Sequence, residues 1–459
     1  MSALWIKNPR LSWDPVDGEA VDGGVVVENG KIIERVRLGS SPSASDCEEL
    51  DASGLVLVPG LINTHHHFYQ TLTRAHHSAL NKPLFPWLEA LYPVWSGLTE
   101  EMIAVSTQLA AAELMLSGCS TAVDHHYVFP AGLENAIDVQ AEAMAAIGMR
   151  AVLTRGSMSL GRSAGGLPPD TVVQTNAEIL RDSERLIDRL HDSTEGSMCQ
   201  IVLAPCSPFS VTTELMRDTA ALAKQRDVLL HTHLAETDDE NDFCLETFGM
   251  RPVDYMASCD WLNERVWFAH GIHFSDAELT ALGQAGCGIT HCPSSNMLLA
   301  SGVARVRDLE AAGVRVGLGV DGSASNDGSN MIQEVRQAFL MQRLASQLAG
   351  AEAELVTHTD ALRWATSGGA SLLRRPELGR ISVGSAADIA LFSLDEPRFS
   401  GSEDALAALI LCGAQRVNTL LVNGELRVHK GELLGVDMAQ LQAAHQSAAD
   451  ALIRLRRQA

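Results

Sequence analysis

The sequence predicts an α/β fold in which a (β/α)8 TIM barrel is joined to a small β-sandwich domain built from the N- and C-terminal segments. Eight strand-like apolar runs alternate with helical stretches through the middle of the chain. Near each end, an Asn-Gly pair (Asn29-Gly30 and Asn423-Gly424) separates two β-rich runs, a strong hairpin signal. The third observation is that most histidines fall where the strand-like runs end. Chemistry in such barrels takes place at these strand ends, so a site is expected there.

We expect the small domain to comprise residues 1–57 and 376–436, the barrel residues 58–375, and a terminal helix residues 437–459. The first barrel strand is predicted within the apolar run 55–62, which only Pro59-Gly60 interrupts. The predicted strands end at Ile62, Val123, Thr154, Ala204, Leu230, Ala269, Thr290 and Val320.

Helices are predicted between these strands, for example over residues 99–116 and 212–224. The S/T-x-x-E patterns Thr237–Glu240 and Ser275–Glu278 predict capping boxes, and residues 357–375 a helical return to the small domain. An open doubly wound sheet is the structural alternative, but no G-x-G-x-x-G follows the first strand.

Composition restricts the partners and the compartment. The chain has 459 residues, a net charge of −23 and a pI near 5.0, so its surface should repel nucleic acid, and any nucleobase it handles should be free. No apolar run suits a signal peptide or a membrane span. The nine cysteines are scattered without a C-x-x-C, which favours free thiols in a reducing cytoplasm.

Histidines at the strand ends predict a metal site. On a strand, residues i and i+2 point to the same side, so His65 and His67 can bind one ion while His66 points away. Alone, this H-x-H would be read as a His-rich loop. Further histidines and acids follow later strands, however, and a buried structural histidine explains only one or two of them. These residues are His125, His126, His231, His233, Glu236, His270, His273, His291 and Asp321.

The segments PGLINTHHH, HTHLAET, FAHGIH, THCPSSN and LGVDGSASND, in this order, resemble the amidohydrolase superfamily, in its branch of aminohydrolases acting on heterocyclic bases. The resemblance spans about residues 1 to 435. NTHHHFYQTLTRA, DHHYVFPAGL, LTRGSMSLGRSAGGLPPD and LAPCSPFSVT are similar to the bacterial 8-oxoguanine deaminases, with guanine deaminases and hydroxytriazine aminohydrolases as near relatives. This resemblance implies hydrolytic deamination of 8-oxoguanine to urate and ammonia, with isocytosine as a second substrate.

The resemblance also implies one divalent metal per chain, zinc or alternatively iron, held by His65, His67, His233 and Asp321. Spacing alone leaves His231 and His233 open, and the family places the ligand three residues before the glutamate. The two-metal version of this fold usually needs a lysine after the fourth strand. No lysine occurs between Lys82 and Lys224, which favours a single metal.

The same resemblance assigns three catalytic roles. Glu236 is expected to shuttle protons, His270 to orient the attacking water and Asp321 to accept its proton. The alternatives are a surface helix position for Glu236 and a structural or second-metal role for His270. The cytidine-deaminase signature H-x-E…P-C-x-x-C is missing, since Pro205-Cys206 is followed by Ser207.

Substrate contacts are expected from several further residues. Gln70 lies where guanine deaminases place a glutamine that reads the purine edge, with a solvent-facing helix N-terminus as the alternative. Trp87 or Trp95 could stack on the base, or each could pack in the core. Cys206 stands where guanine deaminases have an arginine, which argues against guanine. Arg155 could assist, or it could form a structural ion pair. His125 and His126 are candidates for the pocket rim. The competing functions are a guanine or hydroxytriazine aminohydrolase and a non-catalytic scaffold, and the family implies a homo-oligomer.

Overall fold

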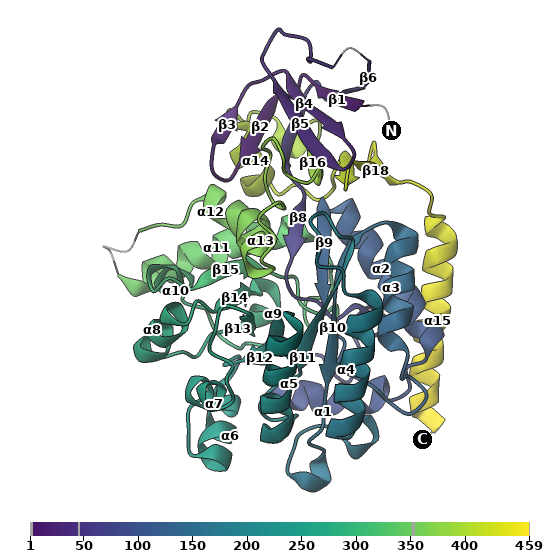
Figure 1. The fold of residues 1–459 in the computed structure, drawn as a ribbon, viewed down its shortest axis with the longest axis vertical. Coiled ribbons are helices and arrows are strands. Elements are labelled where there is room, and N and C mark those ends of the chain that lie inside the picture. Colours follow the sequence, from purple (N-terminus) through teal and green to yellow (C-terminus); the bar gives the residue numbers. More distant parts are fainter. Residues whose placement is uncertain (1–2, 45, 351–353, 459) are drawn as a thin grey trace.

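The computed structural model describes residues 3–44, 46–350 and 354–458, and its centre is the predicted barrel (Figure 1). Eight parallel strands follow one another in chain order around it, so the predicted fold class is confirmed. The first and last strands meet where the Thr64 N–H donates to the Leu318 carbonyl at 3.0 Å. The strands are β8 (Leu61–Asn63), β9 (Cys119–Asp124), β10 (Arg150–Ser157), β11 (Cys199–Pro205), β12 (Leu230–Leu234), β13 (Val266–His270), β14 (Gly288–His291) and β15 (Arg315–Leu318).

The apolar run 55–62 forms two strands in different sheets rather than one. β7 (Leu55–Pro59) pairs with strands of the small domain, and β8 begins the barrel at Leu61. The chain passes between the two sheets at Gly60, where an added Cβ would lie 2.5 Å from Ser120 Oγ. The fifth strand also differs from the prediction, because it starts at Leu230 and contains both His231 and His233.

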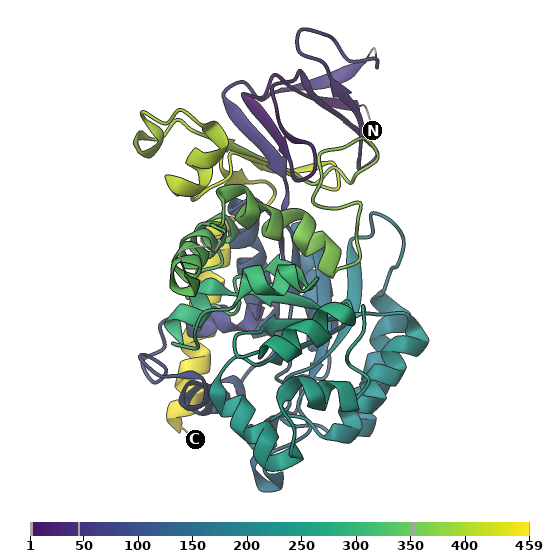
Figure 2. The same ribbon diagram turned by 90° about the vertical axis from the view of Figure 1, so that its left-hand side faces the viewer.

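Helices cover the outside of the barrel, as Figure 2 shows from the side. In α4, the buried residues Ile179, Ser183, Leu186 and Ile187 recur at helical spacing and face the strands. The predicted capping box at Ser275 is present, whereas Thr237 makes no side-chain capping bond and that prediction is wrong. The helices are α2 (Glu100–Leu116), α3 (Ala136–Ile147), α4 (Asn176–Leu190), α5 (Thr213–Arg226), α6 (Asp238–Phe248), α7 (Pro252–Ser258), α8 (Asp276–Gln284), α9 (Pro293–Leu298), α10 (Val306–Ala311) and α11 (Met331–Ala349).

Both ends of the chain build the small domain, as predicted. It contains a four-stranded sheet and a seven-stranded sheet. At both predicted hairpins, the Asn and the Gly have positive φ (50° and 77°, 52° and 79°), as a two-residue type I′ turn requires. Its strands are β1 (Ala3–Lys7), β2 (Leu11–Asp14), β3 (Gly18–Ala20), β4 (Gly24–Glu28), β5 (Lys31–Val36), β6 (Cys47–Asp51), β7, β16 (Ile389–Ser393), β17 (Thr419–Val422), β18 (Glu425–His429) and β19 (Glu432–Leu433).

The remaining helices lie in the segment after β8, in the return to the small domain and within it, and at the C-terminus. α1 (Leu84–Trp95) lies in the long segment between β8 and β9, and α15 (Met438–Gln458) packs along α2 and α1 (Figure 1). The return to the small domain is α12 (His358–Arg363), a π-helical turn (Trp364–Gly368) and α13 (Gly369–Leu372), with α14 (Ala405–Leu411) inside the small domain. Among the described residues, none of these helices is long and apolar enough to span a membrane.

Candidate metal and active site

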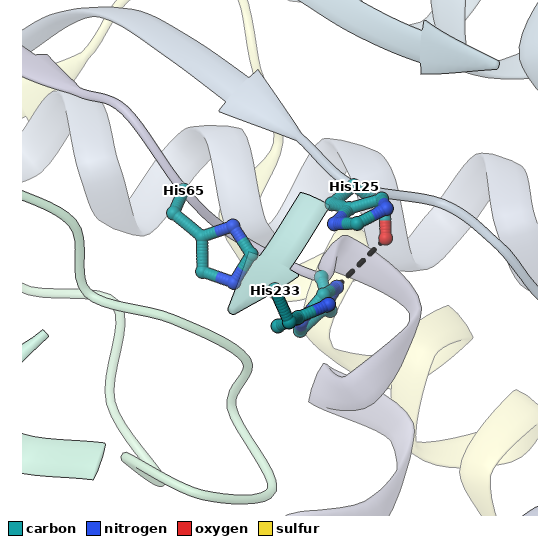
Figure 3. A group of neighbouring side chains, drawn as sticks. His65, His125 and His233 are labelled. Carbon is teal, nitrogen blue, oxygen red and sulfur yellow. Dashed lines mark hydrogen bonds between the residues drawn. The ribbon is translucent and has the colours of Figure 1, made fainter. Parts of the chain in front are cut away.

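Three histidines and one aspartate converge at the C-terminal ends of the barrel strands. Asp321 Oδ1 lies 3.3 Å from His65 Nε2 and 3.2 Å from His67 Nε2, and His233 Nε2 lies 3.3 Å from His67 Nε2. Figure 3 shows His65, His125 and His233 reaching this point from separate segments. The structure therefore brings together all four residues that the sequence singled out as metal ligands.

Each of the three histidines is oriented by a hydrogen bond at Nδ1, the ring nitrogen that faces away from the centre. His67 Nδ1 donates to the His125 carbonyl and His233 Nδ1 to the Cys206 carbonyl, both at 2.7 Å. A carbonyl can only accept, so Nδ1 carries the proton and the Nε2 lone pair faces the centre. Such support from behind is typical of histidines that bind metal.

His231 provides the same support for His65. Its Nδ1 donates to the Trp267 carbonyl at 2.9 Å, and burial lowers the pKa of His231 to about 3, so the ring is neutral. Its Nε2 must then accept from His65 Nδ1, at 2.8 Å. Of the two histidines that spacing left open, His233 faces the centre, and His231 faces away from it but fixes the tautomer of His65.

The donor set fits a divalent metal. His65 Nε2 is buried and has no hydrogen-bond partner among the described residues. Burial would raise the pKa of Asp321, but the contacts with His65 and His67 hold it well below its usual value. Neutral imidazoles with one carboxylate are ligands that suit zinc and related ions. His125 also belongs to the cluster, with a ring nitrogen within 4.8 Å of those of His65, His67 and His233.

A buried acid–base pair lies beside this centre. Glu236 Oε2 is 3.4 Å from His270 Nε2, and Asn296 Oδ1 is 3.0 Å from His270 Nδ1. The Ser301 hydroxyl donates to Glu236 Oε1 at 3.4 Å. Glu236 is only 4% exposed, and burial raises its pKa. It is therefore not a surface residue of α6, and a raised pKa suits a group that both takes and gives protons.

A cavity with polar and apolar residues in its wall opens onto the cluster. Gln70 lines it, and its Oε1 accepts from the Ala324 N–H at 3.3 Å, so Nε2 is the amide group available to a ligand. Trp87 lines it too, with its Nε1 donating to the Ala324 carbonyl at 3.0 Å. The wall comprises His67, Gln70, Leu84, Trp87, Leu88, Tyr127, Phe209, His233, Glu236, His270, Leu299, Asp321 and Ser325.

Three residues expected to contact the substrate lie outside this wall. Trp95 packs in the core and donates to Thr73 Oγ1. Arg155 is held by Asp182 and Gln174 and covers the Phe129 ring. The Cys206 carbonyl accepts from His233 Nδ1, and Cys206 is not part of the wall. Trp87 and Gln70 are therefore the residues among the expected substrate contacts that line the cavity.

Of the remaining histidines, His126 is buried away from the wall, with both ring nitrogens lacking a partner among the described residues. Tyr127, Phe209, Asn296 and Ser301 belong to the site but were not predicted. They lie in the segments after strands whose ends had been identified, so proximity to those ends was the available signal.

A (β/α)8 barrel with such a cluster and a buried glutamate beside it defines a metal-dependent hydrolase. Residues 56–427 match the amidohydrolase family model, and the chain belongs to this family. It is 57% identical to 8-oxoguanine deaminase of Pseudomonas aeruginosa over 453 residues, which covers 99% of this chain and 100% of the relative.

The names of two more distant relatives refer to atrazine compounds rather than to a purine. Hydroxydechloroatrazine ethylaminohydrolase of Pseudomonas sp. strain ADP is 36% identical over 86% of this chain and 83% of its own. Atrazine chlorohydrolase from Arthrobacter aurescens TC1, crystallised with zinc, has a TM-score of 0.92 at 30% identity, covering 98% of this chain and 100% of that chain.

Proposed function

We propose that this protein deaminates 8-oxoguanine by hydrolysis, giving urate and ammonia. The observation that carries the proposal is the 57% identity to an 8-oxoguanine deaminase along 99% of the chain, together with a complete cluster of His65, His67, His233 and Asp321. Isocytosine, which carries the same amidine portion, is the second substrate. When bound, a divalent metal supplies Lewis acidity and lowers the pKa of water to about 7.

The protein's own groups handle the protons. A water molecule adds its oxygen to C2 of the base, and Asp321, beside His65 and His67, accepts a proton from it. Glu236 gives its proton to the ring nitrogen next to C2, takes the second proton of the water from the new C2 hydroxyl, and gives that proton to the amine. The C2–N bond then breaks, the C2 carbonyl forms and ammonia leaves, and the proton on Asp321 returns to Glu236 for the next turnover. His270, fixed by Asn296, stabilises the charge that develops near Glu236.

The cavity wall suits a planar lactam. Gln70 presents Nε2 as a donor, which matches the carbonyl of a 2-amino-6-oxo ring. Leu84, Leu88 and Phe209 provide apolar contact surface. A ring with an amine in place of that carbonyl would set a donor against a donor, so 2,6-diaminopurine should be a poor substrate.

We further propose zinc as the metal, one ion per chain, and a cytoplasmic homo-oligomer that binds no nucleic acid. The zinc-bound relative supports the choice of metal, and the charge of −23 supports the absence of nucleic acid. Metal analysis of protein purified without added metal tests zinc against iron. Light scattering during gel filtration tests the oligomeric state.

Ammonia release from a panel of bases tests the proposal. Fast turnover of 8-oxoguanine, with guanine slow, is the expected result. Turnover of guanine or a hydroxytriazine without 8-oxoguanine would instead favour the second candidate, an aminohydrolase for those rings, which the relatedness to a triazine enzyme supports. No turnover and no bound metal would point to a non-catalytic scaffold.

A further inference from the structure

Glu240 is a buried acid in the first turn of α6 that has no part in the chemistry described above. Its side chain is fully buried, and Oε2 has no hydrogen-bond partner among the described residues. In a capping box, this glutamate would bond to the N-cap residue, Thr237. Instead, Oε1 accepts from the N–H of Ala235 at 2.9 Å, two residues further back.

The Ala235 backbone is held in an unfavourable conformation. Its φ is +53°, in the left-handed region, which is unfavourable for alanine because the Cβ comes too close to the carbonyl oxygen. Both backbone polar groups of Ala235 are hydrogen-bonded. Glu240 binds its N–H, and its carbonyl accepts from the N–H groups of Ile272 and His273 at 2.9 and 3.0 Å. Ala235 directly precedes Glu236, so this conformation sets the direction in which Glu236 leaves the strand.

We propose that Glu240 is a positioning residue for Glu236, and that its carboxyl group keeps Ala235 left-handed by binding the Ala235 N–H. Without that bond, the segment relaxes toward an ordinary extended or helical backbone, and the Glu236 carboxylate moves away from His270. The inference rests on the proposed function only in that Glu236 moves the protons.

Substitutions of Glu240 distinguish a role in hydrogen bonding from a role that needs a negative charge. Burial raises the pKa of Glu240 to about 8, which makes the group a neutral acid at pH 7. A glutamine keeps the length and the accepting oxygen, so Glu240→Gln should behave like the wild type. Aspartate keeps the acid but is one methylene too short to reach the Ala235 N–H.

The test compares Glu240→Gln, Glu240→Asp and Glu240→Ala, each with and without Ala235→Gly. Glycine adopts positive φ without a Cβ penalty, so it should replace the function of the Glu240 bond. With a cost of about 1–2 kcal/mol for a left-handed residue, kcat of the Asp and Ala variants should fall about 5- to 30-fold. KM and metal content should stay near wild type. Adding Ala235→Gly should restore most of the loss.

Three outcomes would overturn the inference. They are an unchanged kcat in Glu240→Asp and Glu240→Ala, a loss in Glu240→Gln equal to that in Glu240→Ala, and no rescue by Ala235→Gly in folded, metal-loaded protein. The ratios are measured on whichever base of the panel the wild type turns over, so failure of 8-oxoguanine refutes the proposed function alone. Crystal structures give a substrate-independent result: Ala235 should lose its positive φ in Glu240→Asp but keep it in Glu240→Gln.

Discussion

Replacing His231 should weaken metal binding although this residue does not face the centre. His231→Phe keeps a flat ring that can stack on Trp267, as His231 does with ring centroids 4.4 Å apart. It removes the acceptor for His65 Nδ1 and leaves the Trp267 carbonyl without its donor. His65 can then place its proton on Nε2, where it blocks a metal ion.

The expected loss follows from these two bonds. A buried polar group left without a partner costs about 1–3 kcal/mol, and loss of a partner behind a metal-binding histidine typically lowers metal affinity about 10- to 100-fold. We therefore expect a loss in that range for His231→Phe. His231→Gln, which can place an accepting oxygen near the position of Nε2, should lose less.

Zinc affinity is measured by equilibrium competition with a chromophoric chelator, and metal content after dialysis provides a second readout. The matched control is His126→Phe, because His126 is equally buried but neither of its ring nitrogens has a partner among the described residues. Wild-type affinity in His231→Phe, or an equal loss in His126→Phe, would refute the assignment of the His65 tautomer.

Three further changes test the site. Glu236→Gln should lower kcat by at least about 100-fold, measured as ammonia release, while metal content stays at the wild-type level, because the amide cannot carry protons. Gln70→Leu should raise KM for 8-oxoguanine about 5- to 10-fold, as expected for one lost hydrogen bond, and an unchanged KM would exclude the contact. Glu240→Gln should gain stability over the wild type as pH rises from about 4.5 to 8, measured by urea unfolding. The pKa of Glu240 is raised to about 8 in the folded protein, so the stability that its bound proton provides is present at low pH and is lost as the pH rises through this window. The titratable groups that face Glu240 are Glu236, Cys206 and Cys244. Equal slopes in the two proteins would contradict this.

The place of the metal site could be predicted because it depends on strand topology, whereas the choice of His233 over His231 came from the family resemblance. Parallel barrel strands bring their C-terminal ends to one face, so His65, His233 and Asp321 had to be close once the eight strands were recognised. The hairpins were predictable for a similar reason, since an Asn-Gly pair favours a turn with two positive φ values.

The substrate wall could not be predicted in the same way, because it depends on how helices dock. Trp87 and Trp95 are both buried in α1, and only the placement of that helix turns the first toward the cavity. Arg155 ends inside a network with Asp182, a residue on α4 that no local pattern connects to it. The capping box at Thr237 failed because Glu240 binds a more distant amide.

The left-handed residues connect these local failures to function. Ala235, His270 and Asp321 have φ values of +53°, +73° and +62°, and each lies at or just after the end of a barrel strand. A left-handed residue other than glycine costs about 1–2 kcal/mol, so three at one site need compensating bonds. Glu240 supplies one for Ala235, and His65 supplies another, since its carbonyl accepts from the Asp321 N–H at 3.1 Å. Sequence rules describe unstrained backbone, so they fail where the chain leaves a strand abruptly to turn a side chain into the site. The failed capping box marks such a place, and it is there that the structure assigns Glu240 its role.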